Sequence, residues 1–304
     1  MVKEDSITSL RMPAWLVKPF PKKASQVGVG KILSRWRLNT VCRSAQCPNL
    51  CECYSQGTAT FMIMGDICTR NCMFCAVSGG IPGSLEADEP VRVALAVKDM
   101  GLSHIVVTSV TRDDLPDGGA MHFAATINAI RKVNPDTTVE VLVPDFKGSQ
   151  TCVETVVKAV PDIFAHNLET VPGLYKNVRP MADYRRSLEV LKSAKDLNKG
   201  IYTKSGIMLG LGETEAEIIA VMQDLRIIDC DFLTLGQYLS PSEDHLPVNK
   251  FISPEKFEDL AQIGQKMGFS GVAAGPFVRS SYHAKELLNM KEASIQSPDC
   301  SLAV

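Results

Sequence analysis

The chain has 304 residues, of which 45% are hydrophobic, 32 are basic and 34 are acidic, giving a formal net charge of −2. This length suffices for one large domain with extensions, and the balanced charge without a basic stripe argues against a nucleic-acid partner. No apolar run is long enough to span a bilayer, so a membrane partner is not expected either.

Short runs rich in β-branched residues alternate with helical patterns. Strands are predicted at 60–64, 104–110, 138–143, 162–167, 202–208 and 232–238, and helices at 91–100, 121–133, 150–159, 184–197, 215–228 and 254–267. This α/β alternation is typical of a parallel sheet covered by helices. Six units fit a partial (β/α)6 barrel better than a closed eight-stranded barrel. The predicted domains are an N-terminal extension (1–57), the barrel (58–250) and a C-terminal extension (251–304).

The N-terminal extension carries Cys42, Cys47 and Cys53 at CxxxxCxxxxxC spacing. These are three thiolates without an obvious local fourth, which favours a metal cluster over a structural zinc site, because zinc needs four ligands and tends to use paired CxxC units. A zinc site and disulfides remain the alternatives. Cys51 is either a ligand in another register or a bystander thiol.

A second group, Cys68, Cys72 and Cys75, stands at CxxxCxxC spacing directly after the first predicted strand. Three thiolates hold three irons of a cubane 4Fe-4S cluster and leave the fourth iron open to a cofactor or substrate. The alternative is a zinc knuckle, but no second CxxC pair completes a tetrahedral site. Oxidation would destroy both cysteine groups as ligands. Together with the acidic residues and missing hydrophobic core of residues 1–6, this predicts a cytoplasmic location.

Polar and glycine-containing motifs follow the second, fourth and fifth predicted strands. Reacting groups of parallel barrels gather at the carboxyl ends of the strands, so we expect these motifs to face one cavity. Their cofactor-binding candidates are Thr108, Arg112, Asp113, Asn167, Glu169, Lys204, Gly210 and Glu213.

Each candidate also has a structural alternative. Arg112 and Asp113 could form a solvated turn, and Asn167 and Glu169 a hydrogen-bonded strand end. The glycines after the fifth strand suit an ordinary strand-to-helix turn. Lys204 lies in an otherwise apolar strand, where it needs a carboxylate partner, from either a cofactor or an internal salt bridge.

The loop of residues 68–75 resembles the cluster loop of radical S-adenosylmethionine (SAM) enzymes. Within that superfamily the chain resembles the lipoyl synthases over about residues 15–284. The resemblance is carried by residues 40–42, 47–49, 52–53, 108–120, 167–170, 204–214 and 275–282. Arg43, Ser44, Cys51 and Tyr54 depart from the family pattern, but none of them replaces a proposed cluster thiol.

The resemblance implies a TIM-like partial barrel with two 4Fe-4S clusters. The open iron on Cys68, Cys72 and Cys75 would bind SAM and cleave it to a 5'-deoxyadenosyl radical. An auxiliary cluster on Cys42, Cys47 and Cys53 would take its fourth ligand from a serine of the motif RSSY. We slightly prefer Ser281, with Ser280 as the alternative, and expect Arg279 to keep that serine in an electropositive environment.

The implied reaction inserts two sulfur atoms, drawn from the auxiliary cluster, at carbons 6 and 8 of an octanoyl chain on a protein lysine. Two SAM molecules are consumed per lipoyl group. Implied partners are an octanoylated E2 subunit of a 2-oxoacid dehydrogenase or the glycine-cleavage H protein, a reductant such as flavodoxin or ferredoxin, and an iron–sulfur carrier.

Two alternatives remain for the function. One is another radical SAM sulfur-inserting enzyme similar to biotin synthase, against which the upstream cysteines and the RSSY motif argue. The other is a two-cluster electron carrier, but carriers use four thiolates per cluster and rarely need a chain of this length.

Overall fold

A computed structural model describes residues 11–18, 26–282 and 284–288, so residues 1–6, considered above for targeting, lie outside the described ranges. The core is one eight-stranded sheet in the linear order β1 to β8. The first strand pairs antiparallel with the second, and all later neighbours pair parallel. The strands are β1 (Asn39–Thr40), β2 (Thr60–Ile63), β3 (His104–Ser109), β4 (Thr138–Leu142), β5 (Ile163–Ala165), β6 (Tyr202–Leu209), β7 (Phe232–Gln237) and β8 (Gly271–Gly275).

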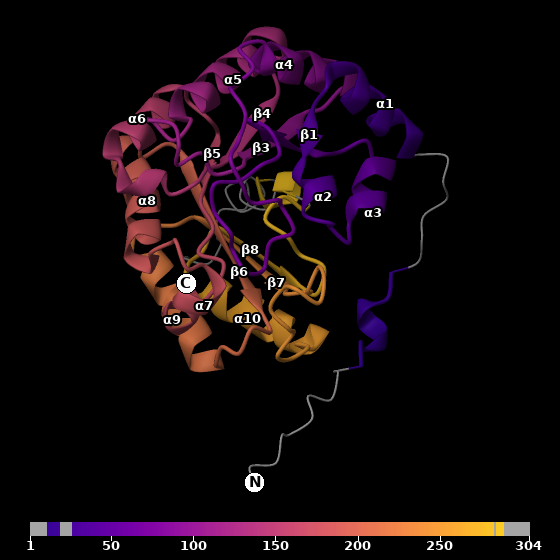
Figure 1. Ribbon diagram of the computed structural model, residues 1–304. Coiled ribbons are helices and arrows are strands. Elements are labelled where there is room, and N and C mark those ends of the chain that lie inside the picture. Colours follow the sequence, from indigo (N-terminus) through magenta and orange to yellow (C-terminus); the bar gives the residue numbers. More distant parts are fainter. Residues whose placement is uncertain (1–10, 19–25, 283, 289–304) are drawn as a thin grey trace, which may run out of the picture.

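The helices that connect the parallel strands form an outer layer around the sheet (Figure 1). They are α4 (Glu89–Met100), α5 (Ala120–Val133), α6 (Gln150–Lys158), α8 (Tyr184–Leu197), α9 (Glu215–Ile227) and α10 (Pro254–Lys266), with the short α7 (Tyr175–Val178) before α8. Short 3₁₀ helices lie at Ala14–Leu16, Phe146–Gly148 and Pro172–Leu174. None of the helices in the described ranges is both long and apolar enough to cross a membrane.

The fold class is confirmed: the sheet is that of a partial TIM-like barrel. All six predicted strands and all six predicted helices are present, with ends that differ by a few residues. The sheet has two further strands. Strand β1 is only two residues long, and β8 is glycine- and alanine-rich, so neither carries a strong strand pattern.

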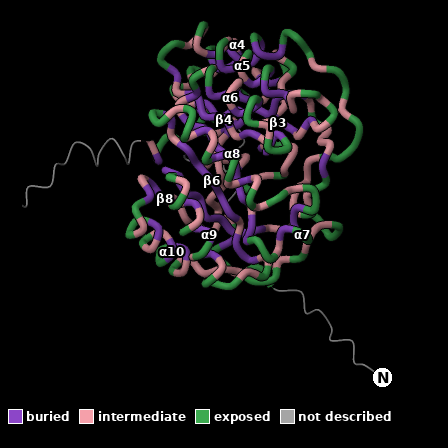
Figure 2. The backbone as a smooth tube through the Cα atoms, turned by 90° about the vertical axis from the view of Figure 1, so that its left-hand side faces the viewer, coloured by how far each residue is buried: buried purple, intermediate pink, exposed green. Residues whose placement is uncertain are grey.

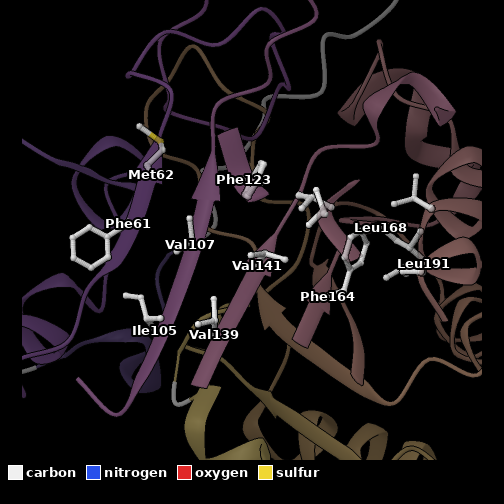
Figure 3. Packing of buried hydrophobic residues seen from close by; sticks show 14 of the residues in the cluster. Phe61, Met62, Ile105, Val107, Phe123, Val139, Val141, Phe164, Leu168 and Leu191 are labelled. Atoms are coloured by element: carbon white, nitrogen blue, oxygen red, sulfur yellow. The ribbon is translucent and has the colours of Figure 1, made fainter. Parts of the chain in front are cut away.

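The strands are buried on both faces, as parallel strands between helices usually are. All four residues of β2 are buried, and the central residues of β3 and β4 are buried as well. Figure 3 shows Phe61, Val107 and Val141 on these three neighbouring strands, with Phe123 of α5 packed against them. In Figure 2 the buried residues concentrate in the strands, whereas exposed residues are frequent on the outer helices. The core thus fixes the strands that support the loops above them.

Two extensions lie at the open side of the sheet. Helices α1 (Gln26–Trp36), α2 (Val41–Ser44) and α3 (Leu50–Ser55) precede the barrel, and the chain after β8 comes near them (Figure 1). The amide of Asn49 donates to the Phe277 carbonyl at 2.7 Å. After β8 the chain also crosses β7 closely, because a Cβ atom on Gly236 would collide with the Val278 carbonyl oxygen. Glycine is therefore required where the C-terminal segment passes over the sheet.

Gly236→Ala should lower the free energy of unfolding by about 2 kcal/mol, because the added methyl group overpacks this crossing. Urea unfolding of the metal-free protein measures the change. Gly83→Ala is the matched control, since its added Cβ meets no atom within 4 Å. Equal stability of the two variants would contradict this account of the crossing.

Candidate active site

The loop after β2 carries Cys68, Cys72 and Cys75 and is bonded to the rim of the sheet. The sulfur of Cys68 accepts hydrogen bonds from the backbone N–H groups of Arg70 (3.4 Å) and Thr111 (3.3 Å). Burial raises the pKa of Cys72, and it raises that of Cys75 to about 12. Cys68 and Cys72 add to the rise at Cys75, so the three sulfurs are electrostatic neighbours. This donor set fits an iron–sulfur cluster, which takes thiolates and displaces their protons.

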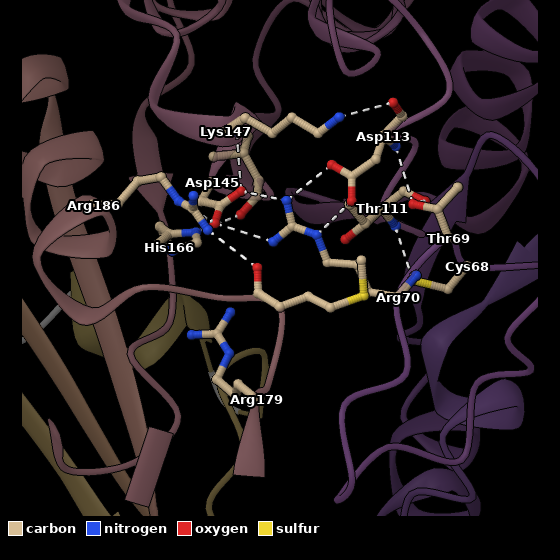
Figure 4. A network of polar contacts seen from close by, with 12 residues as sticks. Cys68, Thr69, Arg70, Thr111, Asp113, Asp145, Lys147, His166, Arg179 and Arg186 are labelled. Atoms are coloured by element: carbon tan, nitrogen blue, oxygen red, sulfur yellow. Dashed lines mark hydrogen bonds and ion pairs between the residues drawn. The ribbon is translucent and has the colours of Figure 1, made fainter. Parts of the chain in front are cut away.

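Arg70, which lies between the first two cysteines of the loop, anchors it to the ends of β3 and β4 (Figure 4). Its guanidinium binds Asp113 through Nε (2.6 Å) and Nη2 (2.9 Å), and Asp145 through Nη1 (3.0 Å) and Nη2 (2.7 Å). Arg186 adds a second contact to Asp145 at 2.8 Å. Although burial disfavours its charged form, Asp145 has a pKa well below the usual value because of Arg70. Paired bidentate contacts of this kind fix both distance and orientation.

Asn167 and Glu169 follow β5 beside the cluster loop. The amide nitrogen of Asn167 donates to Glu169 Oε1 at 3.0 Å and to Ser280 Oγ at 2.5 Å. The Asn167 Oδ1 atom is buried without a hydrogen-bond partner among the described residues. Burial raises the pKa of Glu169, and this carboxyl also raises the pKa of Cys72 and Cys75, so it lies near their sulfurs. The unpartnered oxygen is an acceptor that a ligand could satisfy.

Arg179 belongs to this site but was missed by sequence analysis. It is buried, and its Nη1 donates to the carbonyls of Asn167 (2.9 Å) and Leu168 (3.1 Å). Burial raises the pKa of Cys72 and that of Glu169, and the positive charge of Arg179 opposes both rises. The only sequence signal was an arginine in a loop, which usually indicates a solvated residue.

The remaining cofactor candidates line the rim and have partners within the protein. The Thr108 hydroxyl donates to the Leu142 carbonyl. Arg112 is 2% exposed, so the alternative of a solvated turn is wrong for this side chain, which bonds Asp114 and the carbonyls of Met64 and Gly83.

The side chain of Glu213 closes the turn after β6. Glu213 accepts hydrogen bonds from the backbone N–H groups of Gly210 (2.5 Å) and Leu211 (2.9 Å), and Gly210 has a φ of 100°. Thr214 caps α9 in a capping box with Glu217. A cofactor contact of Gly210 or Glu213 stays a prediction.

The structure pairs Lys204 with an internal carboxylate rather than a cofactor. Its Nζ lies 2.8 Å from Glu140 Oε1, and both side chains are fully buried. Burial disfavours the charged form of Glu140, but the positive charge of Lys204 holds the pKa of Glu140 below its usual value. Lys204 is the third residue of β6, and about 16 Å of strand separates it from Leu209, the last residue of β6. It therefore belongs to the lower part of the barrel, away from the cysteine loop.

The upstream cysteines also lie together. Burial raises the pKa of Cys53 to about 12, and Cys42 and Cys47 add to the rise, so these three thiols are electrostatic neighbours. All cysteines of the described ranges are free thiols, so the disulfide alternative is wrong. In those ranges no three His, Cys, Asp or Glu side chains converge on one ion position.

The RSSY motif lies between the two cysteine groups. Arg279 is an electrostatic neighbour of both Cys47 and Glu169, and burial lowers its pKa. Its Nη1 donates to the Val278 carbonyl at 2.7 Å. The hydroxyl of Ser280 reaches Asn167 inside the barrel. Sequence positions separated by more than two hundred residues thus form one site.

His166 is a further buried group at the end of β5. Its Nδ1 donates to the Val143 carbonyl at 2.8 Å, and its Nε2 has no partner among the described residues. Burial lowers the pKa of His166 to about 4. The ring is therefore neutral at physiological pH.

Known proteins are similar to this chain in sequence. The chain matches the radical SAM superfamily over residues 62–225. It is 57% identical over 277 residues to the lipoyl synthase of Caldanaerobacter subterraneus subsp. tengcongensis, covering 91% of this chain and 96% of that protein. It is 52% identical over 283 residues to the lipoyl synthase of Caldicellulosiruptor bescii, covering 93% and 97%.

Solved structures share the fold at low sequence identity. A maturase of the [FeFe]-hydrogenase has a TM-score of 0.57 and 14% identity, covering 88% of this chain and 67% of its own. Methylornithine synthase has a TM-score of 0.53 and 16% identity, covering 68% and 61%.

Lys204→Met should destabilise the metal-free protein by about 3–5 kcal/mol in urea unfolding, because it leaves Glu140 charged and buried without its cation. Adding Glu140→Leu should recover most of this loss. Lys192→Met, which breaks an exposed pair with Asp196, should leave the stability nearly unchanged, because exposed ion pairs contribute little. If Lys204→Met kept full stability and lost only SAM affinity, Lys204 would be a cofactor ligand instead.

Stability should fall as pH is lowered from 6.5 to 4, partly because of His166. In this window the unfolded chain protonates the imidazole and the folded chain does not. The unfolded state then binds more protons, so His166 alone accounts for a loss of about 3 kcal/mol. His166→Gln should flatten the pH dependence of urea unfolding by that amount. Identical pH profiles for parent and variant would contradict this.

Proposed function

Because the chain belongs to the lipoyl synthase family of the radical SAM superfamily, we propose that it inserts two sulfur atoms at carbons 6 and 8 of an octanoyl-lysine on a lipoyl carrier domain. The observation that carries this proposal is that Arg279 interacts electrostatically with Cys47 of one cysteine triad and with Glu169, which in turn interacts with Cys72 and Cys75 of the other triad. A carbon radical and a sulfur source must be within reach of one alkyl chain, and such an arrangement provides both.

Cys68, Cys72 and Cys75 would hold the cluster that binds SAM. When bound, this cluster and SAM supply the electron and the 5'-deoxyadenosyl radical that abstracts hydrogen. Asn167 and Glu169 would orient SAM through the unpartnered amide oxygen and the half-buried carboxylate. The rim residues would shape the rest of its site: Thr108, Arg112, Asp113, Gly210 and Glu213.

Cys42, Cys47 and Cys53 would hold the auxiliary cluster that provides sulfur, with a serine of the RSSY motif as fourth ligand. A hard alkoxide is a more labile iron ligand than a thiolate, which suits a cluster that is taken apart. The hydroxyl of Ser280 accepts a hydrogen bond from Asn167, which lies beside the other cysteine group, so Ser281 would be this ligand, with Ser280 as the alternative. Arg279 would hold the surroundings electropositive.

The remaining parts of the proposal concern organisation and partners. Residues 1–57 would carry the auxiliary cysteines, 58–250 most of the barrel, and 251–304 its last helix and strand together with the serine. Two SAM molecules would be used per lipoyl group. The octanoylated substrate would be an E2 subunit or a glycine-cleavage H protein, the reductant a flavodoxin or ferredoxin, and an iron–sulfur carrier would rebuild the auxiliary cluster. The many free thiols suit a cytoplasmic location.

The test is mass spectrometry of an octanoyl-lysine peptide after anaerobic incubation with reconstituted protein, SAM and a strong reductant. The peptide should gain two sulfurs and lose two hydrogens, with 5'-deoxyadenosine as co-product. Cys72→Ala should abolish both products. Cys47→Ala should still form deoxyadenosine but transfer no sulfur.

Cys51→Ala is the matched control, because Cys51 lies in the same segment but outside the proposed ligand set, and it should retain both products. Sulfur transfer by Cys47→Ala would contradict the auxiliary cluster. Absence of both products from the fully loaded parent protein would contradict the enzyme function.

A further inference from the structure

The amino group of Lys18 joins segments that are far apart in the chain. Its Nζ donates to Asn49 Oδ1 and to Glu52 Oε2, both at 2.6 Å. The same group lies 4.4 Å from the ring centroid of Phe277 and 5.0 Å from that of Tyr282. A cation over two aromatic faces gains attraction from both rings. Lys18 therefore contacts the upstream cysteine segment and the C-terminal segment at once.

The two segments also bond each other around Lys18. The Tyr282 hydroxyl donates to Glu52 Oε1 at 2.7 Å, so Tyr282 and Lys18 take different oxygens of one carboxylate. Asn49, which is 1% exposed, donates to the Phe277 carbonyl at 2.7 Å. The side chains of Lys18 and Glu52 are 24% and 32% exposed, so their ion pair is less screened than one on the open surface.

These contacts lie on both sides of the proposed auxiliary ligands. Residues 49–52 stand between Cys47 and Cys53, and residues 277–282 contain both candidate serines. More than two hundred residues separate the two stretches. A serine oxygen is a weaker iron ligand than a thiolate, so the iron–oxygen bond alone is a poor means of holding the segments together.

We propose that Lys18, Asn49, Glu52 and Tyr282, here called the Lys18 clamp, are positioning residues that hold the serine segment against the auxiliary cysteines. The clamp would keep the fourth ligand in reach when the cluster is built or loses iron. This inference rests on the proposed function, because it assumes that Cys42, Cys47 and Cys53 bind a cluster. It adds a role for an N-terminal lysine that lies outside both cysteine motifs.

The first test needs no cluster. In metal-free full-length protein, Lys18→Met should speed amide hydrogen exchange over residues 276–282 by about fivefold, because a charge-assisted contact of a partly buried pair is lost. Lys18→Arg keeps the charge and should restore most of the protection. Lys192→Met, which breaks the exposed pair with Asp196, should leave exchange in this segment unchanged.

The second test reads the auxiliary cluster alone. In a background with Cys68, Cys72 and Cys75 changed to Ala, reconstituted protein should release iron to a chelator about fivefold faster after Lys18→Met or Tyr282→Phe, on the same energetic grounds. The iron–sulfur absorbance follows the loss. In the otherwise unchanged chain, Lys18→Met should still cleave SAM to deoxyadenosine at the parent rate.

The outcomes distinguish a failure of the Lys18 clamp from a failure of the proposed auxiliary cluster. Faster exchange and faster iron release, both reversed by Lys18→Arg, would support the clamp. Parental exchange and iron release in Lys18→Met would overturn it while leaving the auxiliary cluster intact. A parent background that binds no iron on Cys42, Cys47 and Cys53 would overturn the auxiliary cluster and the clamp together.

Discussion

Seven parallel strands determine where the chemistry of this protein is located. Because β2 to β8 all run in one direction, the loops at their carboxyl ends meet at one rim of the sheet. The cysteine loop after β2, the polar loop after β3 and the Asn167–Glu169 segment after β5 share this rim. A reversed strand would have sent its loop to the opposite end.

Buried charges reinforce this arrangement at two levels of the barrel. At the rim, Arg70 lies between Asp113 and Asp145 and fixes the cysteine loop relative to β3 and β4. In the lower part, Lys204 and Glu140 pair across strands where neither is exposed. Each pair is stable only while both charges are present, since a lone buried charge costs several kcal/mol. These pairs define geometry as much as they contribute stability.

The open side of the sheet has a different requirement. The proposed auxiliary cluster requires that three upstream cysteines and a serine near the other end of the chain come together without the help of the parallel register. Polar contacts between the extensions achieve this: Asn49 and Glu52 bond Phe277 and Tyr282, with Lys18 between them. Gly236 allows the C-terminal segment to cross β7 closely. The cysteine spacing defines the thiolate donors, and the contacts between the extensions determine which C-terminal residues lie opposite these donors.

The sequence by itself determined the six central strands and helices, because β-branched runs and helical periodicity are local signals. It also determined the family, since the cysteine spacings and glycine-containing motifs are contiguous. Only the tertiary structure decided the partner of Lys204. Glu140 lies 64 residues away, and a buried lysine can form an ion pair with any carboxylate that the fold brings near it. It also decided that Arg179 joins the site and that Lys18 links the two extensions. Each of these depends on which distant residues the fold brings within hydrogen-bond distance, and local sequence patterns carry no record of that.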